Sequence, residues 1–376
     1  MLPGRQRAKK PMLPPPTSKY IVQRKAEVRM QCNSRALVRA KLLQILDRPR
    51  VPPDPIQYPP LQADGLDLSG LSVEHVATAV EMGERCPLLL VRLLRLEGKS
   101  LYPVFVLHGT NDSKFTMLQK GFLQRYARLG FVAIGVDSRH MGERAPADKR
   151  SGNAAYWEAC ISAWRVPDGD KQNYPFIWDT VWDMMRLLDW FESDRADVDT
   201  SHVGAIGISL GGMQVWFWAA LDVRVTAPAP AIGVQSFGYA LQNDCWLGRV
   251  KSLQPLFDAV TQDLHRPTDA ASVHAVWAKL LPGLLEYFDA QYTLSCIAPR
   301  PLLIANNAAD PRTPRAGVEE AVAIVRPLWG VESRLQLLMD ESVAPTPLPA
   351  EDWARGHVVT SAMWHEIDKF IEQHLQ

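Results

Sequence analysis

The sequence predicts an α/β fold in which a mostly parallel β-sheet is flanked by helices. Short apolar runs of strand length alternate with stretches whose apolar residues recur at helical spacing, a pattern typical of such sheets. The stretch Ser201 to Met213, SHVGAIGISLGGM, reads as a strand, a tight turn and a helix. Polar residues also follow several predicted strands, at the sheet edge where such folds bind ligands. These residues are His108, Arg139, Ser209, Asp310 and His357.

Composition and charge limit the classes of protein to which the chain can belong. It has 376 residues, 47% of them hydrophobic and 22% charged, so it can bury a sizeable core. The formal net charge is zero, which argues against a nucleic acid as partner. No apolar run is long enough to cross a membrane. The cysteines are odd in number and far apart, which predicts free thiols instead of disulfides or a zinc site. They are Cys32, Cys86, Cys160, Cys245 and Cys296.

Residues 1–60 are predicted to form a basic, Pro-rich N-terminal extension with a short helix over Ser34 to Leu46. Residues 1–26 are basic and lack the apolar core of a secretory signal. We therefore expect a cytoplasmic protein. The alternative is an organelle such as a plastid or mitochondrion, with the basic segment as a transit peptide. Residues 61–376 are predicted to form the main domain.

Apolar runs and turn signals place the elements of this domain. A hairpin of Val73 to Val80 and Leu88 to Leu96 comes first, and residues 145–174 have no regular pattern. The other predicted strands are Tyr102 to Leu107, Phe131 to Val136, His202 to Ile208, Pro228 to Val234, Pro301 to Ala305 and Arg334 to Met339. The predicted helices are Phe115 to Leu129, Ile177 to Glu192, and Arg315 to Val325. Two more are predicted: one that begins after Ser209 and ends at Leu221, and a closing helix led by His357. Residues 237–295 are predicted to be a helical, lid-like insertion.

The turn between the serine strand and its helix carries the first chemical motif. Gly207 to Gly211 reads G-x-S-x-G, and a serine there sits on a strained turn with its hydroxyl above the sheet. The pattern alone can arise by chance. Its position between a strand and a helix makes Ser209 the predicted nucleophile.

A serine nucleophile needs a base and a third group that orients the base. His357, in a Gly-His step before the last helix, is the predicted base, although a surface histidine would give the same pattern. Asp310 follows an apolar strand and is the predicted acid. It could equally cap the next helix, and Asp340 is a second candidate for the acid.

Acyl transfer also needs hydrogen-bond donors for the developing oxyanion. The residue after the nucleophile supplies one backbone N–H, here that of Leu210, and the loop after Leu107 supplies another. Thr110 on that loop is the predicted second donor. His108 is predicted to orient the loop.

Taken together, the motifs LHGT, GISLGG, ADPRTP and GH resemble those of the α/β-hydrolase superfamily. The segments DSRHMGER and APRPLLIANNAADPRTP resemble the branch of dienelactone hydrolases, acetyl xylan esterases and prolyl-oligopeptidase-like enzymes. The resemblance extends from about Leu88 to the C-terminus. It implies an α/β-hydrolase fold and serine hydrolysis of an ester, thioester or amide, with the triad of Ser209, Asp310 and His357. Thr110 and Leu210 carry over as oxyanion donors.

The leading hypothesis is a serine hydrolase of the carboxylesterase type, acting on a small-molecule ester or amide without a cofactor or metal. The alternatives are a peptidase, thioesterase or acyltransferase on the same triad, or an α/β-hydrolase-fold binding protein without turnover. The insertion would act as a lid or pocket wall, with Trp246, Trp277 and Phe288 as candidate wall residues. Arg139 could steer an anionic substrate or pair with Glu143.

Overall fold

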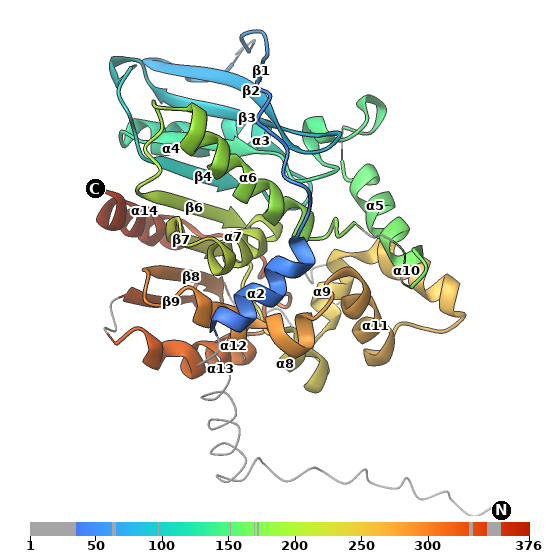
Figure 1. Ribbon diagram of the computed structural model, residues 1–376. Helices are drawn as coiled ribbons and strands as arrows, with labels where there is room; N and C mark the ends of the chain where they lie inside the picture. The colour runs from blue at the N-terminus through green and yellow to red at the C-terminus, as the bar shows by residue number, and fades with distance from the viewer. Residues whose placement is uncertain are drawn as a thin grey trace, which may run out of the picture.

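One mixed sheet runs through the chain (Figure 1). The computed structural model describes residues 35–61, 65–96, 98–150, 152–168, 170, 173–330, 334–343 and 355–376. In these ranges the strands are β1 (Ile56–Gln57), β2 (Leu71–Glu81), β3 (Glu84–Leu93), β4 (Pro103–Leu107), β5 (Val132–Val136), β6 (Val203–Ile208), β7 (Val225–Ala231), β8 (Leu302–Asn307) and β9 (Leu335–Asp340).

The sheet order is β1-β2-β3-β5-β4-β6-β7-β8-β9. Strands β1, β2, β3 and β5 pair antiparallel in that order, and from β5 to β9 every pair is parallel. The predicted hairpin and the mostly parallel sheet are both confirmed. Because β4, β6, β7, β8 and β9 run in parallel, the loops after them meet at one edge of the sheet.

Helices cover both faces of this sheet. The described helices are α2 (Arg35–Leu46), α3 (Lys114–Gln119), α4 (Phe122–Arg128), α5 (Ala154–Arg165), α6 (Trp178–Asp194), α7 (Leu210–Leu221), α8 (Phe237–Gln242), α9 (Leu247–Ser252), α10 (Gln254–Leu264), α11 (Ala270–Leu280), α12 (Ala290–Thr293), α13 (Arg315–Val325) and α14 (Ser361–Leu375). Apolar residues of α2, α6, α7 and α13 form one core cluster with the sheet. Those of α3, α4 and α14 form a second cluster with it.

Two segments differ from the prediction. The predicted helix from Phe115 to Leu129 is two helices, because Gly121 adopts a left-handed φ of 79° that ends α3 and begins α4. The prediction of irregular structure over 145–174 was wrong for α5. Its buried residues Tyr156, Cys160 and Ala163 recur at helical spacing and belong to the face that packs on α10 and α11 (Figure 1, right).

The predicted division of the chain at residue 60 stays a prediction. Residues 1–34 lie outside the described ranges, but α2 packs on α7 and α12. The Arg39 guanidinium donates to the carbonyls of Ala220 (3.1 Å) and Cys296 (2.8 Å), and Leu42 and Leu46 are buried. Helix α2 is therefore part of the same core as the sheet.

Candidate active site

Ser209 lies on the turn between β6 and α7 in a sparsely populated backbone conformation, with φ of 56° and ψ of −109°. Its N–H donates to the Ala231 carbonyl of β7 at 2.9 Å, which fixes the turn to the neighbouring strand. A Cβ on Gly207 would lie 2.1 Å from the Gly211 carbonyl oxygen, and one on Gly211 would lie 2.4 Å from that of Leu107. Both glycines of the motif are thus required by close backbone contact.

The side chains of Ser209, His357 and Asp310 form one hydrogen-bonded chain. His357 Nε2 lies 2.7 Å from Ser209 Oγ, and His357 Nδ1 lies 2.8 Å from Asp310 Oδ2. A carboxylate only accepts, so Nδ1 carries the proton and Nε2 is left to accept from the serine hydroxyl. Asp310 also accepts from the Arg312 N–H and the Thr313 hydroxyl, each at 2.8 Å. These bonds hold the carboxylate toward the imidazole.

Burial and neighbouring charges set the protonation states of this chain. Burial would raise the pKa of Asp310, but the His357 imidazole and the donors to the carboxylate together hold that pKa below its ordinary value. Burial lowers the pKa of His357; Asp310 opposes this, and Arg312 and Arg249 add to it. At neutral pH the arrangement is therefore a carboxylate, a neutral imidazole and a serine hydroxyl, which is the state that a general base requires.

The loop after β4 passes directly beside Ser209. A Cβ on Gly109 would lie 3.3 Å from the Ile208 carbonyl oxygen and 3.5 Å from Ser209 Cβ. Leu210 opens α7, where the first N–H groups of a helix lack intrahelical acceptors. Thr110 and Leu210 thus lie on the two segments next to the serine, and their role as oxyanion donors stays a prediction.

The His108 ring is built into this loop. Its Nε2 accepts from the Ser138 N–H at 3.0 Å, so Nδ1 carries the proton and donates to the Gly109 carbonyl at 2.8 Å. Burial lowers the pKa of His108, which keeps the ring neutral. The ring thereby ties the loop after β4 to the loop after β5.

Several other residues considered from the sequence lie in structural roles. Arg139 donates to both Asp183 oxygens at 2.9 and 2.8 Å and also to Glu81, so neither pairing with Glu143 nor steering a substrate describes it. Asp340 accepts from the Ser342 N–H and the Thr360 hydroxyl, which caps α14.

The three residues considered for the pocket wall differ in how deeply they are buried. Trp277 and Phe288 are each only 1% exposed. Trp277 packs against three other rings, those of Phe176, Phe237 and Phe257. These two side chains are core residues of the insertion, whereas Trp246, before α9, is partly exposed.

Sequence reasoning missed Arg249 and Gln235, which lie beside the loop of Asp310. A Cβ on Gly248 would lie 2.1 Å from the Pro311 carbonyl oxygen, so α9 rests against the loop that carries Asp310. With its amide oriented to satisfy both groups, Gln235 accepts from Arg249 Nε at 3.1 Å and donates to the Arg312 carbonyl at 2.6 Å. Neither residue belongs to a sequence motif. Gln235 lies just before the insertion and Arg249 lies within it, and neither stretch carries a pattern that would have selected them.

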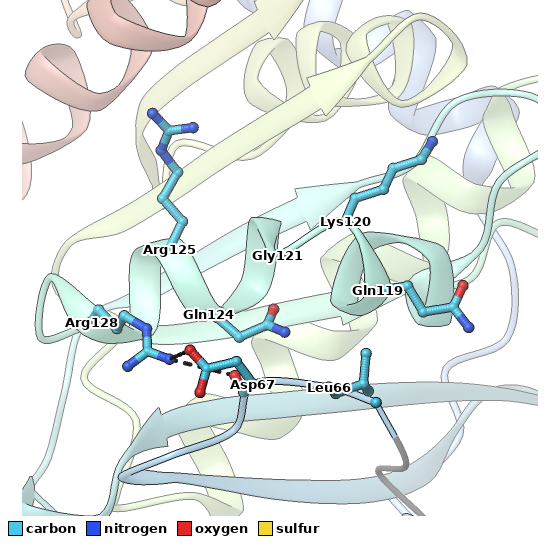
Figure 2. A pocket seen from close by; sticks show the side chains of 9 residues that line it. Leu66, Asp67, Gln119, Lys120, Gly121, Gln124, Arg125 and Arg128 are labelled. Carbon is cyan, nitrogen blue, oxygen red and sulfur yellow. Dashed lines mark hydrogen bonds and ion pairs between the residues drawn. The ribbon is translucent and has the colours of Figure 1, made fainter.

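A separate hollow of about 350 Å³ lies between the turn at Asp67 and helices α3 and α4 (Figure 2). It is lined by the cations Lys120, Arg125 and Arg128, and each of them pairs with a carboxylate, that of Asp112, Asp368 and Asp67 respectively. None of its lining residues belongs to the Ser209 group. It is not a candidate for the catalytic site.

Three further observations concern only the described ranges. None of the helices there has both the length and the apolar character that a membrane crossing requires. No group of three or more His, Cys, Asp and Glu side chains is arranged to hold a metal ion. Cys86, Cys160, Cys245 and Cys296 are free thiols, and Cys32 lies outside these ranges.

The chain has the α/β-hydrolase fold. It resembles a glucuronoyl esterase from Solibacter usitatus (TM-score 0.56, 14% identity, 90% of this chain and 92% of that chain). It also resembles acetyl xylan esterases from Paenibacillus sp. R4 (TM-score 0.53, 17% identity, 96% of each chain) and from Thermoanaerobacterium sp. JW/SL YS485 (TM-score 0.58, 17% identity, 82% of this chain and 88% of that chain).

The chain is also similar in sequence to a protein named as a hydrolase. The curated protein "Putative hydrolase YtaP" of Bacillus subtilis (strain 168) is 26% identical over 195 residues, which span 52% of this chain and 53% of that protein. The match therefore covers about half the length of the relative. No protein-family model matches the chain.

Proposed function

We propose that the chain is a serine hydrolase that cleaves a carboxylic ester. The observation that carries the proposal is the hydrogen-bonded chain from Ser209 through His357 to Asp310, next to the loop after β4. The structural neighbours named above are esterases, which favours an ester over a peptide or thioester. A pure binding protein would have no need of a strained serine aligned on a neutral imidazole.

The proposed mechanism follows from the direction of each hydrogen bond. Ser209 Oγ attacks the ester carbonyl while His357 Nε2 takes the hydroxyl proton, and Asp310 stabilises the imidazolium that forms. The N–H groups of Leu210 and Thr110 donate hydrogen bonds to the negatively charged oxygen of the tetrahedral intermediate. His357 then protonates the leaving alcohol, which leaves an acyl group on Ser209. Water, deprotonated by His357, attacks this acyl group, and the carboxylic acid is released as Ser209 regains its proton.

The test is hydrolysis of p-nitrophenyl esters of increasing acyl length by the wild type and by Ser209→Ala. Loss of turnover in the variant, with an unchanged unfolding midpoint, is the expected result. Ser201→Ala is a matched control, because Ser201 is exposed and its hydroxyl lies 3.2 Å from a histidine, His202, outside the proposed site. Retained turnover in Ser209→Ala would contradict the mechanism.

A fluorophosphonate probe separates the enzyme from a binding protein. Labelling of the wild type that is lost in Ser209→Ala supports an activated serine. Absence of labelling in a folded wild type would favour the binding protein. Peptide and thioester panels then rank the acyl substrates.

A further inference from the structure

Arg249 is a buried cation that faces no carboxylate among the residues that the structure describes. Its side chain belongs to α9 and is only 5% exposed. Its guanidinium donates to the neutral oxygens of Gln235 and of the Arg312 carbonyl, and no carboxylate in the described ranges lies within ion-pair distance. By contrast, the buried arginines Arg139 and Arg144 share Asp183.

An uncompensated buried charge is costly, by several kcal/mol in proteins. Here the cost is increased by a second cation, because Arg312 lies in the adjoining loop and opposes the charge of Arg249. The carboxylate of Asp310 acts electrostatically on Arg249, but it is already engaged by His357, Thr313 and the Arg312 N–H. A guanidinium cannot lose its proton in this pH range, so it requires an anion from elsewhere.

The location of Arg249 identifies that anion. Arg249 packs beside the Asp310 loop, close enough to His357 to lower the pKa of the imidazole. Gln235 accepts from Nε, and the Arg312 carbonyl accepts one hydrogen of Nη2 at 3.4 Å. Nη1 and the other hydrogen of Nη2 point along the edge of the guanidinium that matches a carboxylate. Because Ser209, His357 and Asp310 form one hydrogen-bonded chain, an ester bound at Ser209 would lie on the side of the molecule that Arg249 borders.

We propose that Arg249 binds a carboxylate carried by the substrate, so that the preferred substrate is an acidic ester. This inference rests on the proposed esterase function. The ester is a half-ester of a dicarboxylic acid or an ester of a hydroxy acid. Arg249 positions it relative to Ser209 and takes no part in the transfer of protons.

Two matched ester pairs test the proposal. Mono-p-nitrophenyl succinate is compared with p-nitrophenyl 4-methylpentanoate, in which an isopropyl group replaces the carboxylate. The acetate of 4-hydroxybenzoate is compared with that of 4-isopropylphenol. The wild type is expected to favour the anionic member of at least one pair in kcat/KM. Arg249→Met should reduce that ratio by about 30-fold, chiefly through KM, and Arg249→Lys should retain part of it.

Arg266→Met is the control, because Arg266 is a partly exposed arginine after α10 that pairs with Asp269 at the surface. In this variant the ratio of kcat/KM for the anionic ester to kcat/KM for the neutral ester should equal that of the wild type. If neither pair shows a preference that depends on Arg249, or if Arg249→Met lowers both members of each pair equally together with the unfolding midpoint, Arg249 is structural and the proposal fails.

A binding measurement separates this inference from the esterase proposal. Titration calorimetry of Ser209→Ala with succinate and with 4-hydroxybenzoate needs no turnover. Binding that is lost in the Ser209→Ala/Arg249→Met double variant supports the carboxylate site even if no ester is cleaved. Failure of both ligands to bind, with neutral esters cleaved by the wild type, overturns the site and leaves the esterase intact.

Discussion

Gly356 passes so close to Ala309 that a Cβ on the glycine would lie 2.1 Å from the Ala309 carbonyl oxygen. The two residues immediately precede His357 and Asp310. The proposed base and the proposed acid are thus brought together by backbone contact between their loops, and we expect the 2.8 Å hydrogen bond between them to depend on this contact.

Gly356→Ala should therefore disrupt the alignment of the base. The added methyl group forces the two loops apart, and a displacement of about 1 Å lowers kcat on the order of 100-fold. Steady-state hydrolysis of a p-nitrophenyl ester measures the effect, with circular dichroism to verify the fold. An unchanged kcat would mean that the loops separate without moving His357.

The two candidate acids make an internal comparison. Asp310→Asn should lower kcat by about 10³–10⁴-fold, because the amide no longer holds the proton on His357 Nδ1. Asp340→Asn should leave kcat within a few-fold, since its carboxylate caps the region of α14 through Thr360. The reverse order of effects would assign the acid to Asp340.

The pH dependence of kcat/KM should report the titration of His357, the proposed base. Burial, with Arg312 and Arg249, holds the pKa of His357 below 6.5 despite Asp310, so the neutral base persists to lower pH. Activity should fall on the acid side with a midpoint below 6.5. Arg249→Met removes a cation that disfavours the imidazolium, so its midpoint should rise, whereas that of Arg266→Met should stay. A midpoint above 6.5 in the wild type would contradict this.

Asp183 anchors the loop after β5 by accepting from two buried arginines, Arg139 and Arg144. Asp183→Asn leaves both cations undercompensated and should reduce the free energy of unfolding by about 3–5 kcal/mol. Urea denaturation measures the change. The exposed pair of Asp263 and Arg165 is the comparison, and Asp263→Asn should have little effect.

Much of this arrangement follows from local signals in the sequence. Ser209, Asp310 and His357 could be predicted because each lies on a loop at the carboxyl edge of the sheet. The apolar periodicity places the strands that lead to these loops, and the short motifs select the residues on them. The break at Gly121 was missed because helical periodicity continues across it. Helix α5 was missed because its face is defined by α10 and α11, which are distant in sequence.

The roles of single polar residues were harder to predict. Arg139 and Arg249 are both arginines in loops or short helices, and their sequence contexts do not distinguish them. Only the folded chain shows that Asp183 faces the first and that no carboxylate in the described ranges faces the second. Which carboxylate faces an arginine depends on residues that are far away in the sequence, so a local sequence pattern does not predict it.

The docking of α2 has a consequence for biosynthesis. Arg39 and Arg35 donate to carbonyls of Cys296 and Ala298, which follow them by 257 and 263 positions. A ribosome adding about 5–20 residues per second needs on the order of 10–50 s to reach those acceptors. During that interval α2 lacks the part of its packing surface that α12 and the segment around Cys296 supply. The docking of α2 is therefore completed only after the end of the insertion has been synthesised.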